Sequence, residues 1–374
     1  MEHKGYSRCL DVIVVALNQA CKGGEKRWYV STLELQLASM DFCRACRSVP
    51  TVHVRVNPES PRSLWSPTKR RTGLISWVFG GSTRVPIVRA VSLTWNLPMD
   101  VLRRSVATEL WKWSESVHVQ GSIPADGLVS VVWPKRLETL VLNTYSFETP
   151  IDAVSWPPTL RDLSFGSFFD QPVVGVKWPA SLERLSFRGG FNQPIVGVVW
   201  PASLQQLEIL GYFDQPIAGV AWPASLQQLY IAGCFDQPIA EVVWPACLQQ
   251  LALVCRFNQP IAEVSWPASL QQLAFGFAFN QPIAEVSWPA SLQQLTFGSE
   301  WNQPITGVVW PASLRQLSFG KNFNHSIAGI VWPAALEKLC FGNELLGSTF
   351  DQPLDGVVWP ASLRTVTRGS TILL

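Results

Sequence analysis

The chain has 374 residues, enough for one elongated domain with an appendage or for two or three globular domains, and its net charge is +2. That total conceals an asymmetry, because residues 1–122 hold 17 Lys and Arg against 9 Asp and Glu, whereas residues 123–374 hold 12 against 18. No run approaches the roughly 18 apolar residues of a membrane span, and Val12–Leu17 is too short for a secretory signal, so we expect a cytoplasmic, non-secreted protein.

Residues 1–122 form a basic N-terminal region that we expect to be weakly structured or a small α+β unit. The segment Val52–Val56 alternates like a strand, Pro58–Arg71 has the composition of a linker, and Asp100–Trp113 has helical spacing. Its basic charge suits a solvated tail better than a nucleic-acid site, so nucleic acid is not an expected partner. Leu97-Pro98 resembles the start of an F-box, a module often joined to substrate-binding repeats.

Cysteine usage gives no framework of disulfides, because eight cysteines at irregular spacing are too few for one. Cys43-Arg-Ala-Cys46 has the spacing of half a zinc site, but a second pair of ligands is missing nearby. A redox role would need a thioredoxin-like frame, which the pattern does not show. We expect structural thiols, and whether Cys43 and Cys46 bind a metal stays open.

Residues 123–374 are organised by a repeat. The dipeptide Trp-Pro recurs eleven times, at intervals of 23, then eight of 22, then 27 residues, beginning at Trp133, Trp156, Trp178, Trp200, Trp222, Trp244, Trp266, Trp288, Trp310, Trp332 and Trp359. A fixed period of this length predicts a solenoid whose units bury their apolar faces against their neighbours. The long last interval indicates an insertion at Asn343–Thr349, which we place in a surface loop.

Each unit is predicted to contain a short strand rather than a helix. Leu185 and Phe187 have the two-residue period of a strand, with Ser186 facing the other way. A helix beginning at the proline has too little room, because a Gly and a second Pro follow within the 22 residues. The fold class is therefore mainly β, a parallel β-solenoid of about eleven units.

The unit W-P-A-S-L-x-x-L-x-F-G-x-x-F-[ND]-Q-P-I resembles leucine-rich repeats and, more closely, the FNIP repeat family. FNQPI stands at Phe191–Ile195, Phe257–Ile261 and Phe279–Ile283, and FDQPI at Phe213–Ile217 and Phe235–Ile239. The resemblance covers about Val129–Thr367 and departs from the pattern at Trp301, at Phe147–Pro150 and at Phe323–Ser326. It implies a leucine-rich-repeat-like solenoid with a role in protein–protein contact, and it brings no catalytic residues.

The repeated residues are predicted to build the structure. Rows of Trp and Phe are expected to fill the core, and an exposed Trp ladder for sugars is the disfavoured alternative. The turn slot exchanges Asn and Asp freely, as at Asn192 and Asp214, so its role is to accept backbone N–H bonds in an Asx-type turn. A metal-binding carboxylate row is the second alternative, and the many neutral Asn residues argue against it.

The outward slots of the strands are where the units differ. Six consecutive units place Gln at the same slot, from Gln206 to Gln316, which predicts a uniform polar stripe with little selectivity. The varied side chains cluster earlier, and we predict that they bind the partner: Arg184, Arg188, Glu208 and Tyr230.

These patterns predict a non-catalytic scaffold that binds another protein, of unknown identity, through its exposed sheet face. No phosphate-binding, zinc-protease or nucleophile-elbow motif is present in the sequence, so we expect no catalytic residue, no metal and no cofactor. Two alternatives stay open: a substrate-recruiting subunit of a ubiquitin-ligase-type complex, and a β-solenoid enzyme acting on polysaccharide. The second would need a carboxylate pair on one surface.

Overall fold

The computed structural model describes residues 52–56, 91–98, 115–123, 127–148, 150–342 and 345–373. The predictions for Cys43, Cys46, Pro58–Arg71 and Asp100–Trp113 lie outside these residues. Two compact units are present, one formed by residues 1–120 and 131–140, the other by residues 121–130 and 141–374. The predicted domain boundary at residue 122 stays a prediction. None of the described residues belongs to a helix that could cross a membrane.

In the first unit, parallel strands pair in chain order. Strand β1 (Val52–Val56) confirms the alternating pattern read from the sequence and pairs with β2 (Val91–Pro98). Strand β2 pairs in turn with β3 (Ser116–Ile123). Leu97 and Pro98 thus end a strand, and the residues that would continue an F-box lie outside the described part of the chain.

The second unit contains one strand for each repeat, after β4 (Thr139–Phe147). The strands are β5 (Asp162–Phe165), β6 (Arg184–Phe187), β7 (Gln206–Ile209), β8 (Gln228–Ile231), β9 (Gln250–Leu253), β10 (Gln272–Phe275), β11 (Gln294–Thr296), β12 (Gln316–Phe319), β13 (Lys338–Phe341) and β14 (Thr365–Arg368). All ten are parallel and paired in chain order, and the short β15 (Thr371–Ile372) adds an antiparallel edge to β14. No described residue is helical, so the predicted parallel β-solenoid is confirmed.

The local structure of each coil follows from its prolines and its alternation. The second and fourth residues of most strands are buried, as in β7, where Leu207 and Ile209 face inward. After each Trp-Pro, the leucine donates its backbone N–H to the proline carbonyl, for example Leu182 to Pro179 at 3.1 Å. The described part of the insertion, residues 345–349, lies at the surface as predicted, and Leu345 is 95% exposed.

Stacked aromatic rings fill the inside of the coils. The turn phenylalanines are fully buried and stack from coil to coil, with Phe191, Phe213, Phe235 and Phe257 at successive centroid distances of 6.0 Å. Five neighbouring Trp pairs stack, four of them at 6.4 to 6.5 Å and Trp332 with Trp359 at 5.9 Å. Six of the eleven repeat tryptophans, including Trp200, are buried to 7–8% exposure, while the others are half-buried. The predicted aromatic core is confirmed, with the Trp row at its margin.

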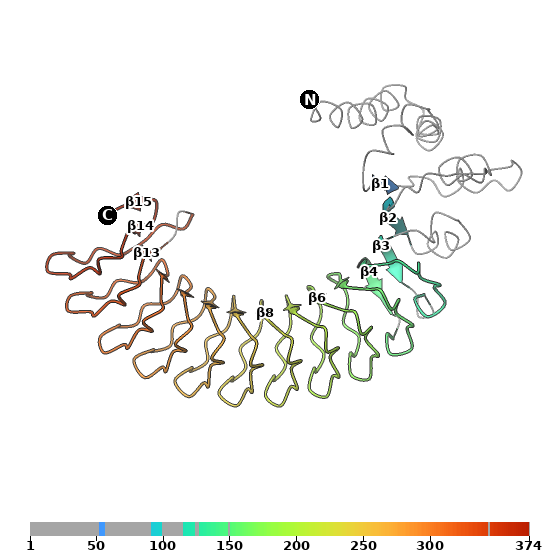
Figure 1. Cartoon of the computed structure of the whole chain (residues 1–374), viewed down its shortest axis with the longest axis horizontal. Helices are drawn as coiled ribbons and strands as arrows, with labels where there is room; N and C mark the ends of the chain where they lie inside the picture. The colour runs from blue at the N-terminus through green and yellow to red at the C-terminus, as the bar shows by residue number, and fades with distance from the viewer. Residues whose placement is uncertain are drawn as a thin grey trace, which may run out of the picture. The chain divides into compact units, whose positions relative to one another are not determined.

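The distances between neighbouring coils explain why the stack of coils is curved. Neighbouring strands in a sheet are about 4.8 Å apart, whereas equivalent aromatic rings of neighbouring coils are 6.0 Å apart in the Phe row and 6.5 Å apart in the Trp pair 178 and 200. The coils therefore spread apart away from the sheet. Strands β5 to β14 consequently line the concave side of an arc, and the turns lie on its convex side (Figure 1).

Candidate functional site

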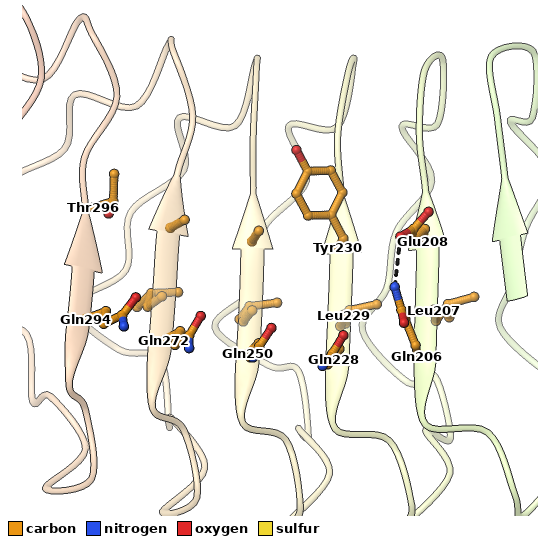
Figure 2. Close-up of a pocket in the computed structure, with 14 residues that line it drawn as sticks. Gln206, Leu207, Glu208, Gln228, Leu229, Tyr230, Gln250, Gln272, Gln294 and Thr296 are labelled. Carbon is orange, nitrogen blue, oxygen red and sulfur yellow. Dashed lines mark hydrogen bonds between the residues drawn. The ribbon is translucent and has the colours of Figure 1, made fainter. Parts of the chain in front are cut away.

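A groove lies on the outward face of five neighbouring strands, β7 to β11 (Figure 2). Its volume is about 280 Å³, and we call it the strand groove. Its outward side chains are Gln206, Glu208, Gln228, Tyr230, Gln250, Ala252, Gln272, Ala274, Gln294 and Thr296, while the leucines between them point inward. It therefore combines the predicted Gln stripe with two of the predicted partner-binding residues.

The Gln side chains form a row because the strands pair in strict register. Gln206, Gln228, Gln250, Gln272 and Gln294 are successive partners across the sheet. The Gln206 side-chain amide donates to the Glu208 carboxylate at 2.9 Å. The carboxamides of the other four have no hydrogen-bond partner among the described residues and point outward side by side (Figure 2). A free carboxamide can both donate and accept, so the row offers the same pair of groups on each strand.

Glu208 and Tyr230 are direct neighbours across strands β7 and β8. Tyr230 is 41% exposed, and partial burial, followed by the nearby Cys255 and Glu208, raises the pKa of its phenol. The hydroxyl is thus protonated at neutral pH and can donate a hydrogen bond. Glu208 is the charged residue among those that line the strand groove. On the following strands small side chains, Ala252 and Ala274, take the place of Tyr230.

The two predicted arginines lie outside the strand groove. Arg184 on β6 pairs with Asp162 on β5 through two hydrogen bonds, one of them from Nη2 to Oδ2 at 2.6 Å. The bond to Asp162 is the main cause that raises the pKa of Arg184. Arg188 lies beyond the end of β6 and is exposed. The structure therefore brings Glu208 and Tyr230 together, and it ties Arg184 to its neighbouring strand.

Exposed aromatic side chains follow the strands, and the sequence reasoning missed them. Four large rings are more than half exposed: Tyr145, Phe168, Tyr212 and Phe277. The last three lie two or three residues beyond the end of a strand, in the loop that carries the chain away from the sheet. The sequence does not distinguish these exposed rings from the core, because a Phe that lies two residues from a core Phe fits the same apolar pattern.

The Asn and Asp residues of the turn act between coils, which corrects the predicted local Asx turn. Each side-chain oxygen accepts the backbone N–H of the equivalent residue in the next coil, as when Asn280 N donates to Asn258 Oδ1 at 2.8 Å. The side-chain amide of the following Gln, here Gln281, donates to the same oxygen at 3.1 Å. We call this row the Asx ladder. Asp serves equally, since Asp214 Oδ1 accepts from Asp236 N at 2.9 Å.

No three His, Cys, Asp and Glu side chains meet as a possible set of metal ligands within the described part of the chain. The carboxylates of Asp214 and Asp236 belong to the Asx ladder. The ladder therefore has a structural explanation, in which backbone N–H groups and Gln side-chain amides are the donors.

Comparison with known proteins matches part of the repeat region to a known family. The family described as FNIP Repeat matches residues 257–300 and 301–344. A crystal structure of a circular leucine-rich-repeat protein, CroV588, is 32% identical and matches 74% of this chain and 43% of its own, with a TM-score of 0.60. The chain thus spans less than half of the length of that protein.

A second solved structure, a leucine-rich-repeat protein from Bacteroides ovatus, is 11% identical over 74% of this chain and 75% of its own. Its TM-score is 0.17, so the two backbones do not superpose as a whole. No curated protein matches the chain. The repeated F-[ND]-Q-P-I units, the parallel coils that they build and the two matched segments agree: residues 257–344 are FNIP repeats, and they lie in a leucine-rich-repeat-like solenoid.

Proposed function

We propose that this protein is a non-catalytic scaffold that binds another protein through the concave face of its sheet. Repeat solenoids of the leucine-rich-repeat type commonly serve as protein-interaction scaffolds, because stacked coils expose one long and continuous surface.

The strand groove is the observation that supports this proposal most. Four of the five carboxamides in its row lack partners among the described residues, so hydrogen-bonding groups are available without first breaking internal bonds. Tyr230 adds an aromatic surface with a hydroxyl donor, and Tyr is enriched at the energetic centres of interfaces. A polar, nearly uncharged groove with one aromatic side chain suits a specific contact with modest affinity.

Substitution of the varied outward residues tests the proposal. We expect Ala at Arg184, Arg188, Glu208 and Tyr230 together to abolish capture of the protein that the full chain binds from an extract. Thermal stability should change little, because exposed substitutions usually shift the free energy of unfolding by about 0.5 kcal/mol. The measurement is quantitative affinity capture alongside a thermal melt.

A matched variant supplies the control. Ala at Val199, Val243, Val309 and Val331 changes four side chains that are 78 to 86% exposed, each directly before a Trp-Pro corner rather than on a strand. This variant should capture the partner as the parent does. Equal capture by both variants would place the interaction surface outside the concave face.

A further inference from the structure

We propose that the strand groove binds an extended partner segment in the polyproline II conformation, which runs across strands β7 to β11 with a basic residue over Glu208. This inference rests on the proposed function and names the form of the partner. It begins from the row of identical carboxamides, which repeats once per strand along the groove.

The repeat distance of the row selects among peptide conformations. Two strand spacings amount to about 9.6 Å, and three residues of polyproline II rise by about 9.3 Å. Measured at the strand backbones, every third residue of such a segment therefore meets every second strand of the groove, and the mismatch over the four strand spacings is about 0.6 Å. An α-helix rises by about 5.4 Å per turn, so it loses register by about 0.6 Å at each strand spacing. A β-strand repeats its side chains every 6.4–6.8 Å or so and fits neither one spacing nor two.

The chemistry of the row favours the same conformation. A polyproline II segment makes no internal hydrogen bonds, so its carbonyl groups are free to accept. The outward amides of Gln228, Gln250, Gln272 and Gln294 are free to donate to them. The backbone groups of an α-helix, in contrast, are already hydrogen-bonded to one another. The Gln carboxamides could then bond only to the side chains of the helix.

The floor of the groove fits a thin extended chain. Ala252 and Ala274 follow Tyr230 at the same position of the next two strands, so the surface is open beside the Gln row. The Tyr230 ring at one end offers a flat face for a proline or another apolar side chain. The strands line a concave surface, which a flexible extended segment follows more readily than a straight helix does (Figure 1).

Charge fixes where the basic residue of the segment lies. Glu208 is the charged residue in the lining, and it lies at the β7 end of the groove beside Tyr230. A Lys or Arg of the partner would complement it there, while the rest of the segment would be uncharged.

Peptide selection on the full chain tests this inference. A display library of random ten-residue peptides is selected on the protein, and the enriched peptides are synthesised and measured by fluorescence anisotropy. We expect Pro at three-residue spacing with Lys or Arg near one end. The triple variant Q250L/Q272L/Q294L should weaken binding of such a peptide at least tenfold, because Leu keeps the volume and removes the carboxamide.

The control changes the residue before each of these. Gln249, Gln271 and Gln293 precede them in the chain and do not line the groove, so Q249L/Q271L/Q293L should stay within twofold of the parent. Glu208→Gln should weaken the binding of the peptide that carries the basic residue. It should leave unchanged the binding of a second peptide in which that basic residue is replaced by Ala. Thermal melts of both triple variants establish that they fold.

Three results would overturn the inference. Enriched peptides with hydrophobic residues at helical spacing would mean that the partner is a helix, and the proposed function would stand. Equal loss of binding in both triple variants would place the peptide site outside the groove. Failure to enrich any peptide, together with groove-dependent binding of an uncharged β-linked hexasaccharide, would make the groove a glycan site and would also overturn the proposed function.

Discussion

Phe277 and Phe279 place the same side chain in two environments two residues apart. Phe279 is fully buried and stacks on Phe257 at 6.0 Å and on Phe275 at 4.2 Å, whereas Phe277 is 58% exposed. Buried aromatic rings contribute large contact areas that a smaller side chain cannot replace. Substitutions at these two positions therefore compare the contribution of a buried Phe to stability with that of an exposed Phe.

We predict that Phe279→Ala lowers the free energy of unfolding by roughly 3–5 kcal/mol, because it opens a cavity between stacked rings. Phe277→Ala should change it by about 0.5 kcal/mol or less. Chemical denaturation of both variants measures the difference. Similar losses in the two variants would contradict the assignment of the Phe279 row to the core.

The Asx ladder makes a second prediction at the residue scale. Asn258→Ala removes the acceptor of Asn280 N–H and of the Gln281 amide, and an unsatisfied backbone N–H costs about 1–3 kcal/mol. Asn258→Asp keeps the acceptor, as at Asp214 and Asp236, and should cost much less. Denaturation curves at neutral pH compare the two. Equal destabilisation would mean that the ladder oxygen contributes nothing beyond volume.

The turn that follows each strand exists in two forms. After β6, β7 and β8 the left-handed residue is Gly189, Gly211 or Gly233, with φ of 60°, 101° and 96°. After β10, β11 and β12 the Gly stands one position earlier, and a Cβ there would lie within 2.0 Å of the backbone of the preceding coil. After β9 the left-handed position holds Cys255, with φ of 74°.

Cys255→Gly is therefore predicted to stabilise the protein. A left-handed conformation costs an L-residue about 1–2 kcal/mol, and the added freedom of Gly in the unfolded chain offsets roughly 0.5–1 kcal/mol of that. The net gain should be up to about 1 kcal/mol, seen as a higher melting temperature. Cys247→Gly, at an exposed cysteine without a positive φ, should lower stability instead. A loss at both positions would contradict the strain at Cys255.

The sequence predicts the element well and its fine structure less well. One strand per 22 residues follows from the Leu-x-x-Leu-x-Phe spacing, because the period-2 pattern recurs in every unit. The ladder was misassigned to a local turn, because the hydrogen bond joins residues 22 apart and local reasoning searches only within the turn. The shift of the Gly by one position is visible in the sequence. Its cause, the close packing of one coil against the next, is visible only in the structure.

At the scale of the whole molecule, the repeat determines the architecture and the exceptions to the repeat determine the surface. The parallel sheet was predictable, because near-identical units can stack in only one register. The strand groove was not, since it arises where the Gln row, Tyr230 and the small Ala252 and Ala274 meet on a curved sheet. The variation between units identifies Glu208 and Tyr230, and the strand pairing explains why they line the same groove as the Gln row.

Removal of whole coils separates these two roles. Excision of Trp266–Ser287 or of Trp222–Val243 takes out one complete coil of 22 residues, and neighbouring coils can close over the gap with near-identical contacts. Excision of only Trp266–Gly276 shifts the register and should unfold the adjacent coils. Circular dichroism and thermal melts distinguish the folded variants from the misregistered one.

Partner capture by the two full-coil deletions tests the central claim most directly. Deletion of Trp266–Ser287 leaves Tyr230 and Glu208 in place and lets Gln294 take the position of Gln272, so capture should persist. Deletion of Trp222–Val243 removes Tyr230 from an equally folded protein, so capture should be lost. Equal capture by the two deletions, or equal loss, would contradict the claim that binding depends on the varied outward residues of a scaffold built from exchangeable coils.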